Sequence, residues 1–367
     1  MADRYVDPVS GNDANGGTTY NTDAWKTLQK AADTAVAGET VYCMNTATEA
    51  PTVTVDFDTN NGTDDAPITF IGADSSGNAL TSGHYTISGS GLGGGVNLIT
   101  WGSSLGNYVT FKRIRFTAAP GDNLRIGDGV TANPAYLTFY DCRIDTATGN
   151  GVYQYNTPTA YINCEIDSNG GNGLGPDPVS GTNRRGFVTM YGCKIHDNTS
   201  AGMVMFYDQN KIIGNLIYDN GTDGITVSRQ FRQNVIVNNV FHANTASGIG
   251  TGISSASGVF DGMIYGNSFV SNGAYGIENL YTQNVTQWID WNHFHGNVTD
   301  ETQFASTPGD HNQSGDPLFT SVVDGSENFA PLTGSPLIGN GPQGSNIGTV
   351  AKLDVASGGG GSFVFAG

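Results

Sequence analysis

The chain has 367 residues, of which 53 are glycine and only 13% are charged, a composition typical of many short strands joined by tight turns. The formal net charge of −18, with 15 basic residues, argues against a nucleic-acid partner, because phosphate binding needs clustered Lys and Arg. No apolar run reaches membrane-spanning length, so no membrane span is predicted.

Residues 1–44 predict an N-terminal segment that ends in a capping helix and enters a first strand at Val41 to Met44. The opening, MADRYVDPVSG, contains no apolar signal segment. Thr22 or Asp23 is expected to cap the helix, and Gly38 to end it. One face of this helix is apolar and consists of Trp25, Leu28, Ala32 and Ala35.

The same opening carries three oxygen ligands, Asp7, Asn12 and Asp13, that could hold Ca²⁺. Hydrogen bonding within turns is the simpler explanation for these residues. No other metal or cofactor site is predicted, and the spacing of the cysteines matches no metal motif.

Residues 45–300 contain a repeat of 22 to 29 residues, which indicates stacked supersecondary units. Each unit has three short apolar runs with alternating apolar positions, and each run is too short for a helix. Short strands stacked in this way predict parallel sheets around an apolar interior. The repeat is clearest in a column of corner residues, which reads Cys142, Cys164, Cys193, Asn215, Asn239, Asn267 and Asn292.

We interpret the four asparagines of this column as a structural ladder, whose side chains bond to one another and to turn backbone. The cysteines of the column are expected to be small buried fillers without disulfides. A second asparagine column follows five residues later, at Asn169, Asn198, Asn220, Asn244, Asn272 and Asn297. A glycine column nine residues after the first, including Gly202 and Gly224, is expected to relieve the next corner.

These repeats, with the opening YVDPVSGNDANGG and the later DPLF and SPLI, resemble the pectate-lyase-like family of right-handed parallel β-helices. The resemblance covers most of the chain and implies an all-β fold, a single-stranded right-handed parallel β-helix with an N-terminal capping helix. This fold carries lyases, hydrolases, phage tailspikes and structural proteins, so it does not fix the activity.

The C-terminal part divides into a closing segment, residues 301–350, and a glycine-rich tail, residues 351–367. The tail, with the apolar tip Phe363 to Phe365, is expected to pack against neighbouring copies. Together with the basic and apolar stretch RQFRQN on an acidic chain, it favours a homo-oligomer, with a trimer preferred.

Extra residues fall after the strand that begins at the glycine column, so these loops should project along one edge, where solenoids usually carry function. The weak catalytic candidates there are Asp177, Asp208, Arg229 and Arg232. Exposed aromatic rings can stack on sugars, and the glycan-binding candidates on this face are Tyr153, Tyr155, Phe206, Tyr207 and Glu278.

A second outward set lies beside the corner asparagines. One column holds Arg143, Glu165 and Lys194, and the next holds Asp145, Asp167, His196, Tyr218, His242 and His295. Opposite charges one coil apart favour cross-strand pairing, and a catalytic or metal-binding His-Asp group is the alternative.

The leading functional prediction is a phage-type virion surface protein, a decoration, fibre or tailspike-like β-helix with a structural and receptor-binding role. Its expected partners are other virion or surface proteins and a polysaccharide. The alternative is an extracellular polysaccharide lyase or glycoside hydrolase that acts on an acidic glycan. A third hypothesis is a carbohydrate-binding surface protein without activity.

Overall fold

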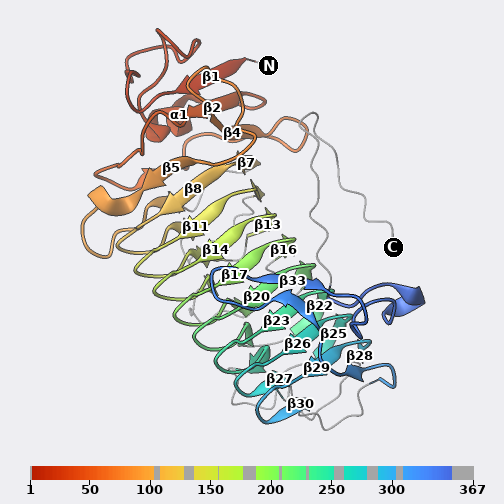
Figure 1. Ribbon diagram of the computed structural model, residues 1–367. Coiled ribbons are helices and arrows are strands. Elements are labelled where there is room, and N and C mark those ends of the chain that lie inside the picture. Colours follow the sequence, from red (N-terminus) through yellow and green to blue (C-terminus); the bar gives the residue numbers. More distant parts are fainter. Residues whose placement is uncertain are drawn as a thin grey trace.

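The computed structural model describes residues 2–102, 108–127, 136–155, 157–176, 187–205, 209–228, 231–251, 260–278, 288–302 and 309–348. Within these ranges the chain winds into a column of stacked coils, and each complete coil contributes one strand to each of three parallel sheets (Figure 1). The predicted parallel β-helix is therefore confirmed. No helix among the described residues is long and apolar enough to cross a membrane.

Sheet A forms one side of the column. Its strands, in spatial order, are β1 (Asp3–Val6), β2 (Thr40–Met44), β4 (Ile68–Ala73), β7 (Val109–Lys112), β10 (Leu137–Tyr140), β13 (Thr159–Ile162), β16 (Val188–Tyr191), β19 (Lys211–Ile213), β22 (Phe231–Val237), β25 (Phe260–Tyr265) and β28 (Trp288–Asp290).

Sheet B follows sheet A within each coil after a tight corner. Its strands are β5 (Tyr85–Ser88), β8 (Ile114–Thr117), β11 (Arg143–Asp145), β14 (Glu165–Asp167), β17 (Lys194–His196), β20 (Leu216–Tyr218), β23 (Val240–His242), β26 (Ser268–Val270), β29 (His293–His295) and β31 (Gln313–Ser314).

Sheet C completes the coil. Its strands are β3 (Val55–Asp56), β6 (Ile99–Trp101), β9 (Leu124–Ile126), β12 (Val152–Gln154), β15 (Leu174–Pro176), β18 (Met203–Met205), β21 (Ile225–Val227), β24 (Ile249–Thr251), β27 (Tyr275–Ile277) and β30 (Asp300–Thr302).

The inward side chains form one continuous apolar core in which like residues stack from coil to coil. Phe111, Phe139 and Tyr161 occupy matching positions on sheet A and stack with ring centroids 5.2 Å apart. Cys142, Cys164 and Cys193 are buried free thiols at the corner before sheet B, as expected. Burial raises the pKa of the Cys142 and Cys193 thiols, which keeps them protonated.

The corner asparagines form a hydrogen-bonded ladder. The side-chain amides of Asn215, Asn239 and Asn267 each donate to the side-chain oxygen of the next asparagine, at 2.9 to 3.0 Å, and the last acceptor is Asn292. A second ladder runs through Asn198, Asn220 and Asn244 on the other side of sheet B. Both ladders satisfy buried corner backbone, which fixes the register of the coils.

The members of the glycine column do not have positive φ, so backbone conformation does not require glycine there. Glycine is required because a side chain would not fit. A Cβ at Gly202 would lie 2.7 Å from the carbonyl oxygen of Gly224 and 2.9 Å from the Asn220 side-chain nitrogen. The glycines therefore let the Asn198 to Asn244 ladder and the neighbouring coil approach closely.

The N-terminal cap contains the helix α1 (Leu28–Thr34), and the strand β1 pairs with β2 ahead of the first complete coil (Figure 1). The predicted caps Thr22 and Asp23 are wrong, because Thr27 is the N-cap and accepts a bond from the Lys30 amide at 3.1 Å. The Asp23 carboxylate instead accepts the backbone amides of Gly16 and Thr18.

Two of the predicted Ca²⁺ ligands of the opening accept hydrogen bonds from the protein. Asp13 accepts the amides of Lys26 and Thr27 and the Thr27 hydroxyl, and Asp7 accepts the Val9 amide and the Thr46 hydroxyl. The Val9 bond lies within a turn, whereas the others join the opening to later parts of the chain, and Ca²⁺ binding stays a prediction.

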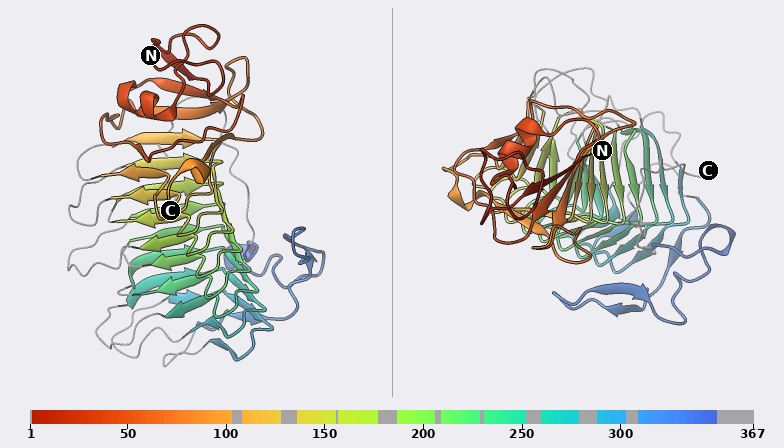
Figure 2. Two further views of the ribbon diagram at one scale, coloured as in Figure 1. Left: turned by 90° about the vertical axis from the view of Figure 1, so that its left-hand side faces the viewer. Right: turned by 90° about the horizontal axis from the view of Figure 1, so that it is seen from above.

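Residues 309–348, here called the strap, begin with β31 at the edge of sheet B and then lie beside the column against the outer face of this sheet (Figures 1 and 2). The strap contains the hairpin β32 (Phe319–Ser321) and β33 (Asn328–Pro331) and a short 3-10 turn, Pro342–Gly344. Phe319 and Phe329 pack on Tyr218 and Val240 in an apolar cluster separate from the main core. The closing segment thus covers a side of the solenoid.

Candidate functional site

The outer face of sheet B carries a ladder of ion pairs on its upstream coils. Arg115 binds Asp145 through two bonds, and Arg143 binds both carboxylate oxygens of Asp167 at 3.0 and 2.8 Å. Arg143 also lies 3.3 Å from Asp145, so this carboxylate sits between two arginines. The predicted cross-strand pairing of the second outward set is present.

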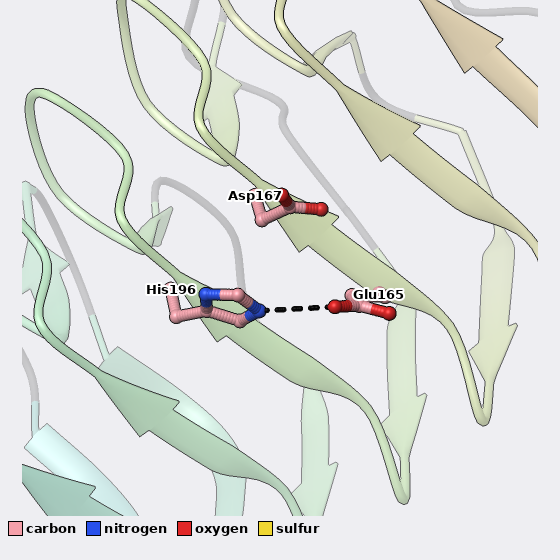
Figure 3. A group of neighbouring side chains, drawn as sticks. All are labelled: Glu165, Asp167 and His196. Carbon is pink, nitrogen blue, oxygen red and sulfur yellow. Dashed lines mark hydrogen bonds and ion pairs between the residues drawn. The ribbon is translucent and has the colours of Figure 1, made fainter. Parts of the chain in front are cut away.

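The ladder of Arg–Asp ion pairs ends at His196. This residue occupies, one coil further on, the sheet position that Asp145 and Asp167 occupy in the preceding coils. Its Nε2 lies 3.3 Å from Glu165 (Figure 3). Its Nδ1 lies 2.7 Å from Asp197, and its ring stacks on Tyr218. The bond to His196 lowers the pKa of Glu165 to about 2, and the carboxylates raise the pKa of His196 against the effect of burial.

Beyond His196 the same face is covered by the strap. Tyr218, His242 and Val270 are buried there, and the His242 ring lies 5.1 Å from that of Phe329. Sheet B therefore presents a charged, open half and an apolar, covered half. Among the described residues, Glu165, Asp167 and His196 form the one group of carboxylate and imidazole donors close enough together to share a metal ion.

The outer face of sheet C carries the predicted glycan-binding residues that the structure describes. Tyr153 is half-buried, and the Arg125 guanidinium lies over its ring, 4.2 Å from the centroid. Tyr155 is also half-buried and packs beside Gly127, where a Cβ would lie 2.9 Å from that of Tyr155. Glu278 lies five strands further along this sheet than Tyr153.

The carboxylate of Asp223, which the sequence did not single out, lies close enough to Glu278 for the two charges to interact. The Glu278 carboxylate accepts the Thr251 amide at 3.0 Å, while Asp223 accepts the Ser247 amide at 3.0 Å and the Thr226 hydroxyl at 2.8 Å. Asp223 lies over Gly250, where any Cβ would collide with the carboxyl group. Two carboxylates from coils on either side thus reach the backbone of one strand, β24.

The two carboxylates have different surroundings. Burial raises the pKa of Asp223, and the negative charge of Glu278 raises it further, while the bonds from Ser247 and Thr226 oppose the shift. A carboxyl group with a raised pKa beside a second carboxylate is an arrangement that acid–base catalysis uses. The sequence showed no clustered carboxylates here because Asp223 and Glu278 are two coil steps apart along the chain. They approach each other only because both lie against β24.

Of the other sequence-predicted candidates, the structure describes the backbone of one, Arg232. Arg232 lies in β22, in register with Asp261 of β25, so part of the predicted loop RQFRQN is strand. The remaining candidates lie outside the described residues and are Asp177, Asp208, Arg229, Phe206 and Tyr207.

Comparisons with known proteins agree with the fold. Residues 128–298 match the family model described as right handed beta helix region. A search of curated proteins finds no match. The structure is similar to pectate lyase Pel9A, with a TM-score of 0.68, 17% identity, and coverage of 95% of this chain and 93% of that one.

Two further solved structures are similar at low identity. A rhamnogalacturonan lyase has a TM-score of 0.58, 15% identity, and coverage of 88% of this chain and 91% of that one. An alginate lyase from Paenibacillus sp. str. FPU-7 has a TM-score of 0.51, 13% identity, and coverage of 78% and 95%. The chain thus has the pectate-lyase-like, right-handed parallel β-helix fold, as its sequence predicted.

Proposed function

We propose that this chain binds a polysaccharide along the outer face of sheet C and hydrolyses it over Gly250, with Asp223 as general acid and Glu278 as general base. The observation that carries the proposal is the pair of carboxylates converging on β24 from either side. The fold supports it, since similar structures include proteins named as polysaccharide lyases.

The proposed chemistry follows from the protonation of the pair. In this proposal Asp223, whose pKa is raised by burial, donates a proton to the glycosidic oxygen as the bond to the anomeric carbon breaks. Glu278 removes a proton from a water molecule whose oxygen attacks that carbon from the opposite side. The missing side chain of Gly250 leaves room for the Asp223 carboxyl group to lie over β24.

Charge favours a neutral glycan at this place. Two carboxylates would repel a uronate, and an eliminating enzyme needs a cation to neutralise that group. Arg125 is the only basic residue in the described strands of sheet C, and it lies five strands from β24, roughly 24 Å at 4.8 Å per strand. Hydrolysis therefore fits the described residues better than elimination of an acidic glycan.

The test is a screen of the full chain against neutral and acidic polysaccharides, with reducing ends and unsaturated products measured separately. We expect reducing ends from a neutral glycan without unsaturated products, and a loss of about 10²- to 10⁴-fold in rate for Asp223→Asn and for Glu278→Gln. The matched control is Asp219→Asn, since burial raises the pKa of Asp219 to about 6 but this residue lies at the sheet B corner.

Cleavage at the wild-type rate in both carboxylate variants would refute the catalytic roles. Unsaturated products from an acidic glycan would favour the lyase alternative. Glycan binding by the wild-type chain without any cleavage would refute the hydrolase and favour the predicted receptor-binding role at a virion surface.

A further inference from the structure

We propose that Glu165, Asp167 and His196, on the open half of sheet B, bind a divalent transition-metal ion. Glu165 and Asp167 lie on β14 and His196 on the next strand, β17, and the three side chains extend from the same outer face (Figure 3). One donor atom from each residue lies within 4.8 Å of the other two, so small side-chain movements would bring all three to a single ion. The site is on a different sheet from the proposed glycan site.

The imidazole is held in the orientation that a metal ligand needs. Asp197 accepts from Nδ1 at 2.7 Å, and Tyr218 stacks on the ring with the centroids 4.6 Å apart and the planes 9° from parallel. Metal-binding histidines generally donate the other ring nitrogen to a carboxylate, which fixes the ring and makes the ligating nitrogen more basic. Nε2 of His196 is thereby directed at Glu165.

The charge pattern of sheet B also calls for a cation at this point. Upstream, Asp145 lies between Arg115 and Arg143. Asp167 has Arg143 on one side, but the matching position on its other side is His196. Glu165 lies between Arg143 and the exposed Lys194 in the sheet, and Asp197 adds a further carboxylate next to His196.

Arg143 donates to both Asp167 oxygens and the Ser168 hydroxyl also donates to Oδ2, so the second lone pair of Oδ1 is the one left for a metal. Mixed imidazole and carboxylate donors suit Zn²⁺, Mn²⁺ or Co²⁺, whereas Ca²⁺ and Mg²⁺ prefer oxygen ligands alone. The sequence offered a metal-binding His-Asp group here as the alternative to cross-strand pairing. It placed Asp167 and His196 in one column and Glu165 in the neighbouring column, but only the fold shows Asp197 and Tyr218 fixing the ring.

The test is calorimetric titration of the full chain with Zn²⁺, and in parallel with Ca²⁺. We expect one Zn²⁺ per chain and no heat from Ca²⁺. His196→Ala and Glu165→Gln should each weaken Zn²⁺ binding at least about tenfold, and Asp197→Asn about 10- to 100-fold. The matched control is His311→Ala, since His311 also bonds a carboxylate, that of Asp290, and stacks on Trp291.

Thermal melts of each variant identify any loss of binding caused by unfolding, and Glu165→Gln, which keeps the side-chain shape, serves if His196→Ala fails to fold. Co²⁺ absorption bands without thiolate charge transfer would support the assigned donors over the cysteines. Absence of Zn²⁺ binding by the wild-type chain would overturn the proposal, as would unchanged binding in folded His196→Ala and Glu165→Gln variants, or equal loss in His311→Ala.

Discussion

Asn239 shows at the scale of one residue how the corners are stabilised. Its side-chain nitrogen donates to the carbonyl of Ile212 and to Asn267, and its oxygen accepts the backbone and side-chain amides of Asn215. All four bonds are buried, so none of these groups has water as a substitute partner. A buried polar group that loses its partner costs more free energy than a made bond contributes.

Replacing Asn239 with leucine tests this ladder, since leucine keeps the volume and removes every donor and acceptor of the side chain. We expect the free energy of unfolding to fall by about 1–3 kcal/mol, because the Asn215 amide and the Ile212 carbonyl lose their partners. Denaturant unfolding measures the change. Thr245→Val, at an exposed position beyond the opposite end of the same sheet B strand, should leave stability within about 0.5 kcal/mol, and equal stability of both variants would contradict the ladder.

At the scale of one element, the helix α1 is attached to the column by a buried carboxyl group. Glu49 accepts the Leu28 amide through both oxygens, at 3.0 and 3.1 Å, and the Tyr85 hydroxyl also donates to it. Glu49 is 7% exposed, and burial raises its pKa from 4.5 to about 7. The attachment of the N-terminal cap to the column is therefore expected to depend on pH through the Glu49 carboxyl group.

Between pH 4.5 and 7 folded Glu49 keeps a proton that the unfolded chain loses, so its stabilising effect is complete below pH 4.5 and is lost as pH rises to 7. The difference across this window is on the order of 3 kcal/mol. Subtracting the unfolding free energy of Glu49→Gln from that of the wild-type chain at each pH isolates this effect. A difference that stays constant from pH 4.5 to 7 would refute the role of Glu49.

The sequence predicted the side-chain interactions that recur from coil to coil and missed those that occur only once in the chain. The Asn215 ladder and the Arg143–Asp167 pairing recur along columns, so period alone located them. The helix cap was placed too early, because Asp23 is a good capping residue whose carboxylate is taken by the Gly16 and Thr18 amides. Asp223 and Glu278 come from coils on either side of β24, where Asp223 lies over Gly250 and Glu278 bonds the Thr251 amide. No sequence spacing indicates this arrangement.

On the scale of the whole molecule, the column carries two different attachments at its two ends. The N-terminal cap joins the main apolar core through Trp25, Leu28 and the rest of its inner face. The strap instead has its own small cluster around Phe329 and lies on the side of sheet B (Figure 2). Since separate cores can open separately, the strap is expected to detach locally before the column unfolds.

His293 makes the strap sensitive to acid. This fully buried side chain bonds the Gly315 carbonyl of the strap through Nε2 at 2.8 Å, and Ser268 lies 3.1 Å from Nδ1. Burial lowers its pKa from 6.5 to about 4, and the nearby charge of His295 lowers it further while Asp316 opposes the shift. When the strap detaches, the pKa of His293 returns to its ordinary value of 6.5. The attachment is therefore fully stable above pH 6.5 and weakens as the pH falls to 4.

Hydrogen exchange of the β31 to β33 amides at pH 7.5 and pH 5, corrected for intrinsic rates, tests this dependence. We expect protection of the strap to fall at pH 5 in the wild-type chain while β14 and β17 stay protected. His293→Gln, which cannot titrate, should lose most of the pH dependence. The N-terminal cap should respond in the opposite direction, because Glu49 stabilises it in acid. Equal pH dependence of strap exchange in the wild-type chain and His293→Gln would show that another group controls its attachment.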